Sequence, residues 1–153
     1  MTSLQVGDKA PAINSIDENG NPITLTQFKG KKIILYFYPK DDTPGCTKEA
    51  CSFRDSYAVL QKKGFVVLGV SVDTEKKHQK FIQKYELNFP LIADTDKKVV
   101  NDYGVWGLKK FMGREYMGTN RVTFIIDEKG KIEHIITKVD TENSAQQLLD
   151  LYK

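Results

Sequence analysis

Apolar residues along the chain fall into short unbroken runs and into helically spaced series, and the two kinds alternate. The runs at 31–39, 65–72 and 89–94 are almost wholly apolar, as strands buried on both faces of a sheet are. Over 44–63 and 75–86 apolar residues recur every three or four positions, which is typical of helices with one buried face. The pattern therefore predicts β–α–β–α–β over this part of the chain.

The remaining segments predict a short helix, a hairpin and a closing helix. Apolar spacing indicates a short helix over 99–104, and residues 121–127 and 131–139 read as two strands joined by a tight turn. An amphipathic helix follows at 145–152. Near the N-terminus, turn-forming residues at 17–22 separate two short strand candidates.

This order of elements sets the fold class. Alternating strands and helices that finish in a hairpin and a helix predict an α/β fold with a mixed central β-sheet and helices on both faces. The arrangement is compatible with a thioredoxin-like fold, although spacing alone does not single that fold out. A length of 153 residues predicts one domain, residues 1–153, with a substantial core.

Charge and hydropathy exclude several functional classes. The 23 basic and 20 acidic residues are interleaved, so a clustered basic face for nucleic acid is not expected. No apolar run is long enough to span a bilayer, and the N-terminus shows no signal-peptide pattern. A cytoplasmic location is therefore expected, where a cysteine pair is more often catalytic or redox-active than structural.

The two cysteines of the chain lie close together in the stretch "YPKDDTPGCTKEACSF" at 38–53. Thr43 can cap the helix that follows, and Pro44 suits its first position. Cys46 then falls in the first turn, where free backbone N–H groups and the positive end of the helix dipole favour a thiolate. The alternative is a small buried apolar residue, because Cys46 shares its register with the apolar face of the helix.

Cys51 is placed where no disulfide to Cys46 can form in an intact helix. Five residues on, it lies about 140° around and about 7.5 Å along the axis, so the two Cα atoms are about 8.7 Å apart. A disulfide needs a Cα separation below about 7 Å. Our hypothesis is that Cys46 reacts first and the helix then unwinds so that Cys51 can reach it. A packing role on the helix flank is the alternative for Cys51.

A zinc site is a poor competitor for these cysteines. The two histidines, His78 and His134, would complete four ligands, but they lie in separate elements without finger-like spacing. We expect both to be ordinary surface or sheet residues, and we expect no metal.

The residues from Pro39 to Cys46 form the PxxxTxxC pattern of peroxiredoxins. With a second cysteine five residues later, "YPKDDTPGCTKEACSFRD" resembles the peroxiredoxin Q subgroup, also called bacterioferritin comigratory protein. The stretches "VGDKAP", "LIAD", "YGVW" and "RVTFIIDEKGKI" are similar to the same family and come in the expected order. The resemblance covers most of the chain and implies a thiol peroxidase on a thioredoxin-like fold.

The resemblance also implies roles for five residues. Cys46 would be the peroxidatic cysteine, whose thiolate becomes a sulfenic acid. Thr43 would hydrogen-bond the thiolate and the peroxide, and Pro39 would shield the pocket from water. Arg121 would stabilise the thiolate and the charge that develops on the peroxide oxygens. Glu49 would help to orient that arginine. From position alone, Arg121 would be a surface residue by default, and an exposed helix position is an equal alternative for Glu49.

Cys51 corresponds to the resolving cysteine of the subgroup, which implies an intramolecular disulfide that thioredoxin or a similar dithiol protein reduces. The implied substrates are hydrogen peroxide and small organic hydroperoxides, without metal, haem or flavin. Because no cysteine follows Cys51, resolution by a C-terminal cysteine across a dimer is not expected, and a monomer is.

Two other functions stay open at this point. A dithiol–disulfide oxidoreductase could use the same fold, although such enzymes usually carry C-x-x-C rather than the four intervening residues found here. A redox sensor or holdase that signals through its disulfide would not need to turn over peroxide at all.

Overall fold

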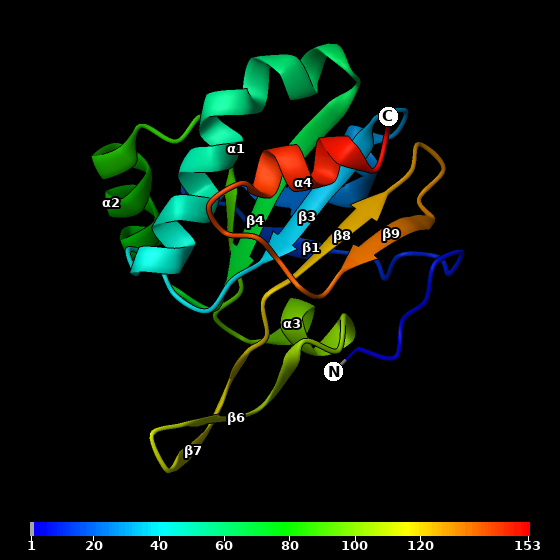
Figure 1. Ribbon diagram of the computed structural model, residues 1–153. Coiled ribbons are helices and arrows are strands. Elements are labelled where there is room, and N and C mark those ends of the chain that lie inside the picture. The colour runs from blue at the N-terminus through cyan, green and yellow to red at the C-terminus, as the bar shows by residue number, and fades with distance from the viewer. Residues whose placement is uncertain (1) are drawn as a thin grey trace.

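The computed structural model describes residues 2–153 and is built around a five-stranded mixed sheet (Figure 1). The strand order is β5-β4-β3-β8-β9, with β3 parallel to β4 and antiparallel to β8. Strands β4 and β5 are parallel, and β8 and β9 antiparallel. The five strands are β3 (Lys32–Phe37), β4 (Phe65–Ser71), β5 (Leu91–Ala93), β8 (Val122–Ile126) and β9 (Ile132–Ile136).

Helices cover both faces of this sheet, as the sequence predicts. The bounds are α1 (Pro44–Lys62), α2 (Glu75–Tyr85), α3 (Lys98–Asp102) and α4 (Ser144–Asp150). Apolar residues of α1, α2 and α4 form one core cluster with the sheet. A second cluster joins the other face of the sheet to α3 and to the N-terminal segment.

Strand β3 shows why the apolar runs are unbroken. Ile33, Leu35 and Phe37 belong to the cluster that contains α3, and the alternate residues Ile34 and Tyr36 belong to the cluster under α1. Side chains of a strand alternate between the two faces of the sheet. Because both faces are covered, every position from Ile33 to Phe37 is buried.

Two features of the structure, a hairpin and a short helix, differ from the prediction. Strands β6 (Trp106–Phe111) and β7 (Arg114–Thr119) pair as an antiparallel hairpin that projects from the body of the molecule (Figure 1). The sequence predicts no strands there, because Lys109, Lys110 and Glu115 interrupt the apolar pattern of a hairpin that is largely exposed. A one-turn 3-10 helix, η1 (Leu25–Phe28), was also not predicted.

The predicted N-terminal pair of short strands is present as β1 (Asn14–Ile16) and β2 (Pro22–Thr24), joined across the turn. Within residues 2–153, none of the helices combines the length and the hydropathy that crossing a bilayer requires.

Candidate active site

The loop between β3 and α1 brings the PxxxTxxC residues to one end of the sheet. Thr43 precedes α1 in extended conformation and Pro44 is the first helical residue, so Cys46 lies in the first turn, as predicted. The predicted capping hydrogen bond is absent, and the Thr43 hydroxyl donates instead to the carbonyl of Lys40 at 2.8 Å. That hydroxyl has a single proton, so it does not also donate to Cys46.

Arg121 reaches Cys46 from the neighbouring strand. Phe37, at the end of β3, lies opposite Val122, at the start of β8, so Arg121 enters beside the loop. Its Nη2 lies 3.2 Å from Sγ of Cys46, and its Nη1 donates to Oε1 of Glu49 at 2.8 Å. The forked guanidinium therefore joins two residues of the first two turns of α1, and each of them is more than seventy positions away from Arg121 in the sequence.

Glu49 is completely buried, which contradicts the alternative of an exposed helix position. Burial raises the pKa of its carboxyl to about 7, although the charge and hydrogen bond of Arg121 act in the opposite direction. Its second oxygen, Oε2, makes no hydrogen bond with any residue from 2 to 153. Glu49 is thus poorly solvated as an anion, and Arg121 is its principal charge partner.

Arg121 is a fixed cation in a largely buried position. Burial disfavours its charge, but Cys46 and Glu49 outweigh that effect, and the pKa of the guanidinium is raised above its usual value. The default expectation of a surface role for Arg121 is therefore wrong. Cys46 is itself only 1 % exposed and belongs to the apolar cluster under α1. Packing alone does not account for a guanidinium hydrogen-bonded to its sulfur, whereas stabilisation of a thiolate does.

Gly45 leaves room for that contact. A Cβ at this position would lie 3.3 Å from Nη2 of Arg121 and 3.8 Å from Cγ2 of Thr141. A side chain there would push against the guanidinium that bonds Cys46, so the glycine of the TPGC stretch has a steric function.

Cys51 lies further along the same unbroken helix and is partly exposed. Both cysteines are free thiols in this structure. Because α1 is regular from Pro44 onward, the geometric argument holds: the helix must open before Cys46 and Cys51 can join. Pro39, partly buried at the start of the loop, completes the set of predicted residues.

The expectation for His78 is wrong, while that for His134 is confirmed. His78 is fully buried although it lies on a lysine-rich helix, and its Nδ1 lies 2.5 Å from Oδ2 of Asp41. His134 lies partly exposed in β9 and packs edge-on against Tyr152. Within residues 2–153, the one group of three potential metal ligands in mutual reach is Asp41, Asp73 and His78, without a cysteine.

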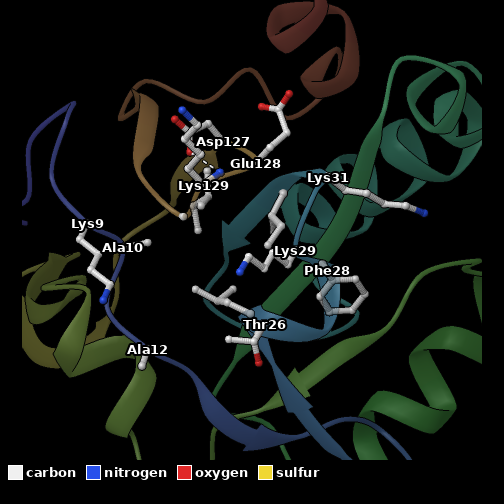
Figure 2. Close-up of a pocket in the computed structure, with 14 residues that line it drawn as sticks. Lys9, Ala10, Ala12, Thr26, Phe28, Lys29, Lys31, Asp127, Glu128 and Lys129 are labelled. Carbon is white, nitrogen blue, oxygen red and sulfur yellow. Dashed lines mark hydrogen bonds between the residues drawn. The ribbon is translucent and has the colours of Figure 1, made fainter.

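A hollow elsewhere on the molecule contains none of these residues. It is lined by apolar side chains such as Ala10 and Phe28, with Lys9, Lys29 and Lys129 around it (Figure 2). No cysteine or histidine lines it. The carboxylates that line it, Asp127 and Glu128, therefore have no thiol beside them.

Comparison with known proteins identifies relatives along nearly the whole chain. The model of the AhpC/TSA family matches residues 6–135. A putative peroxiredoxin bcp of Haemophilus influenzae is 46% identical over 150 residues, covering 98% of this chain and 97% of its own. Peroxiredoxin Bcp of Escherichia coli is 44% identical over all of this chain and 98% of its own.

Solved structures of related proteins are also similar to this chain. The bacterioferritin comigratory protein of Xanthomonas campestris, solved as trapped intermediate and ligand complexes that address its alkyl peroxide reduction activity, superposes with a TM-score of 0.89. Its sequence is 30% identical, and the match covers 99% of this chain and 97% of that one. The likeness confirms a thioredoxin-like peroxiredoxin fold.

Proposed function

Because this chain belongs to the AhpC/TSA family, among peroxiredoxins of the Bcp and Q group, we propose that it is a thiol peroxidase in which Cys46 attacks the peroxide and Cys51 resolves the product. The substrates are hydrogen peroxide and small organic hydroperoxides. The observation that carries the assignment of Cys46 is the Arg121 guanidinium, 3.2 Å from a buried sulfur in the first turn of α1.

In the first step the Cys46 thiolate attacks one oxygen of the hydroperoxide. An S–O bond forms, the O–O bond breaks, and the alkoxide or hydroxide that leaves takes a proton from solvent. Arg121 supplies positive charge next to the sulfur and to the oxygens on which charge develops. The Thr43 hydroxyl, which already donates to Lys40, keeps lone pairs that can accept from the peroxide O–H. Pro39 shields the reacting sulfur from water.

In the second step the first turns of α1 unwind and the Cys51 thiolate attacks the sulfur of the Cys46 sulfenic acid. An S–S bond forms, the S–O bond breaks, and the hydroxide that leaves takes a proton from solvent and becomes water. Glu49 keeps the guanidinium of Arg121 aimed at Cys46 while the helix is intact.

An external dithiol closes the cycle. Thioredoxin or a similar protein exchanges its thiols with the Cys46–Cys51 disulfide and becomes oxidised in turn. Since both cysteines lie on α1, the disulfide can form within one chain, which supports an atypical 2-Cys enzyme that works as a monomer. The proposal includes a single domain and a cytoplasmic location, where such reductants are kept reduced.

Substitution Cys51→Ser separates the two roles. We expect the variant to react with one equivalent of peroxide within about threefold of the wild-type rate, because Cys46 and Arg121 are unchanged. Peroxide turnover coupled to thioredoxin, thioredoxin reductase and NADPH should fall by about 100-fold, because the sulfenic acid has no resolving thiol. Stopped-flow measurement of the first step and the coupled assay read these rates separately. Full coupled turnover by Cys51→Ser would show that Cys51 is not the resolving cysteine.

A further inference from the structure

Two adjacent aspartates join the loop before Cys46 to helix α2. Asp41 is 8% exposed and points into the protein, whereas Asp42 is exposed and adopts a left-handed backbone conformation with φ of 57°. Both lie between Pro39 and Thr43, so they hold the segment that precedes the reacting cysteine.

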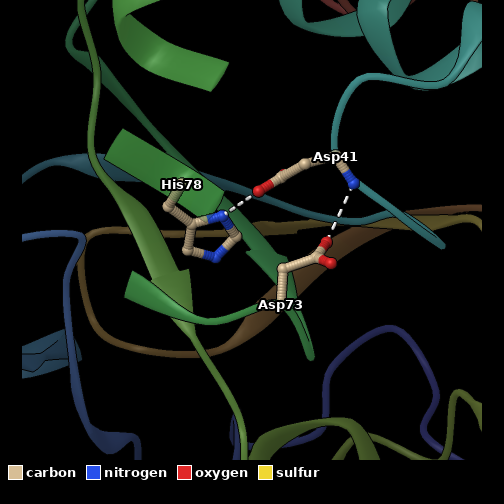
Figure 3. Close-up of side chains that lie close together, drawn as sticks. All are labelled: Asp41, Asp73 and His78. Carbon is tan, nitrogen blue, oxygen red and sulfur yellow. Dashed lines mark hydrogen bonds and ion pairs between the residues drawn. The ribbon is translucent and has the colours of Figure 1, made fainter. Parts of the chain in front are cut away.

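The inner aspartate is enclosed by hydrogen-bond donors. Nδ1 of His78 lies 2.5 Å from Oδ2 of Asp41 (Figure 3). Tyr38 donates its hydroxyl to Oδ1 of the same carboxyl at 2.6 Å. The backbone N–H of Asp41 donates to Oδ2 of Asp73 at 2.8 Å, and the same oxygen accepts from Ser71. The loop is thus bound through the carboxylate of Asp41, which contacts His78 of α2, and through the backbone amide of Asp41, which contacts Asp73 just after β4.

The hydrogen-bond partners of His78 indicate which of its ring nitrogens carry a proton. Nε2 of His78 lies 2.9 Å from the carbonyl of Ile92, which can only accept, so Nε2 carries a proton. Nδ1 faces an oxygen of Asp41, so it also carries a proton when that carboxylate is ionised. Burial opposes a charged imidazole, but the bond and charge of Asp41 prevail and raise the pKa of His78. Both ring nitrogens of His78 and one carboxylate oxygen of Asp41 are thus engaged in hydrogen bonds, and these contacts use atoms that a metal would need as ligands.

The exposed aspartate, Asp42, also binds residues of helix α2. Lys84 Nζ lies 2.9 Å from one oxygen of Asp42, and the Tyr85 hydroxyl donates to the other at 2.8 Å. These hydrogen bonds lower the pKa of Asp42, so its carboxylate stays ionised. Helix α2 therefore holds the loop at two successive residues, one buried and one exposed.

We propose that His78, acting through Asp41, is a positioning residue that fixes the loop from Pro39 to Thr43 for attack by Cys46. The inference rests on the proposed peroxidase function. Within residues 2–153 the hydrogen bond to the Cys46 sulfur comes from Arg121, and none of the residues that hold Asp41 and Asp42 makes one. The hydrogen bonds to Asp41 and Asp42 fix the loop before α1. This loop stays folded when the first turns of α1 unwind. The reduced enzyme therefore returns to one geometry. A misplacement of about 1 Å of a reacting group can cost about 100-fold in rate.

The test measures two reactions of Cys46 in a Cys51→Ser background. Hydrogen peroxide needs the arranged loop, whereas iodoacetamide needs only an accessible thiolate. We expect His78→Leu to slow the peroxide reaction by about 30-fold and the iodoacetamide reaction by less than about threefold. His78→Asn, whose amide can replace the Nδ1 donor, should recover part of the loss. The parent protein must first react with peroxide at Cys46, and its failure to do so would refute the proposed function rather than the role of His78.

A second pair of variants covers the case in which His78→Leu does not fold, which circular dichroism will show. Lys84→Met removes one contact to Asp42 on an exposed surface, and we expect a loss of about threefold in the peroxide rate alone. Lys76→Met is the matched control, because Lys76 is exposed on the same helix and should leave the rate unchanged. Equal losses toward both reagents, or an unchanged peroxide rate in the folded His78 and Lys84 variants, would overturn the proposal.

Discussion

Substitution Cys46→Ser is expected to abolish the reaction with peroxide. The serine hydroxyl stays protonated beside Arg121, so the attacking thiolate is lost while the pocket is preserved. Loss of a catalytic nucleophile lowers rates by about four orders of magnitude or more. Stopped-flow mixing of the reduced protein with hydrogen peroxide, or with an organic hydroperoxide, measures the change.

Cys51→Ser is the matched control, because it makes the same chemical change on the same helix, five residues further along the chain. Within residues 2–153 no arginine donates a hydrogen bond to the Cys51 sulfur, although Arg54 lies near it, so we expect Cys51 to react only slowly with peroxide in the Cys46→Ser variant. Retention of the fast reaction in Cys46→Ser would contradict the assignment, and the pair would have to be interpreted as packing residues or as a sensor.

Removal of Arg121 is expected to have the second largest effect. Arg121→Met takes away the hydrogen bond to Cys46 and the fixed charge, and we expect the peroxide reaction to slow by about 100-fold to 1000-fold. Without the arginine, the pKa of Glu49 should rise above its value of about 7, because Arg121 is the group that lowers it. Glu49 would then be neutral in the folded variant at pH 7.

Two further variants separate charge from geometry at this position. Arg121→Lys keeps a charge but not the fork that reaches both Cys46 and Glu49, so an intermediate rate is expected. Glu49→Gln can still accept from Nη1, and we expect a loss of about tenfold or less. An Arg121→Met variant that folds and reacts at the wild-type rate would show that the guanidinium does not assist the chemistry.

Much of the architecture follows from residue patterns. Strands β4, β5 and β8 are buried along their whole length, and β3 is buried from Ile33 to Phe37, so these strands appear in the sequence as unbroken apolar runs. Helix α1 begins at Pro44, as its sequence indicates. The hairpin of β6 and β7 was missed because it has no buried face to impose a regular alternation. A buried element has a recognisable pattern of apolar residues in the sequence, whereas an exposed hairpin does not need one.

The contacts around Cys46 could not be derived from spacing. Arg121 meets Cys46 only because β8 pairs with β3, a pairing between strands far apart in the chain. Family resemblance identified Arg121, whereas its position at the start of a strand did not. His78 was missed although a signal existed. It lies three residues before Phe81, on the buried face of α2, but its lysine neighbours suggested an exposed position.

Amide hydrogen exchange over residues 43–55 in reduced and oxidised protein tests the central claim most directly, namely that α1 must unwind for Cys46 and Cys51 to join. After one equivalent of peroxide, we predict faster exchange in this segment and unchanged exchange in β3. The Cys51→Ser protein, treated in the same way, should show no such increase. A Cys46–Cys51 disulfide seen by mass spectrometry together with unchanged protection of residues 43–55 would contradict the account.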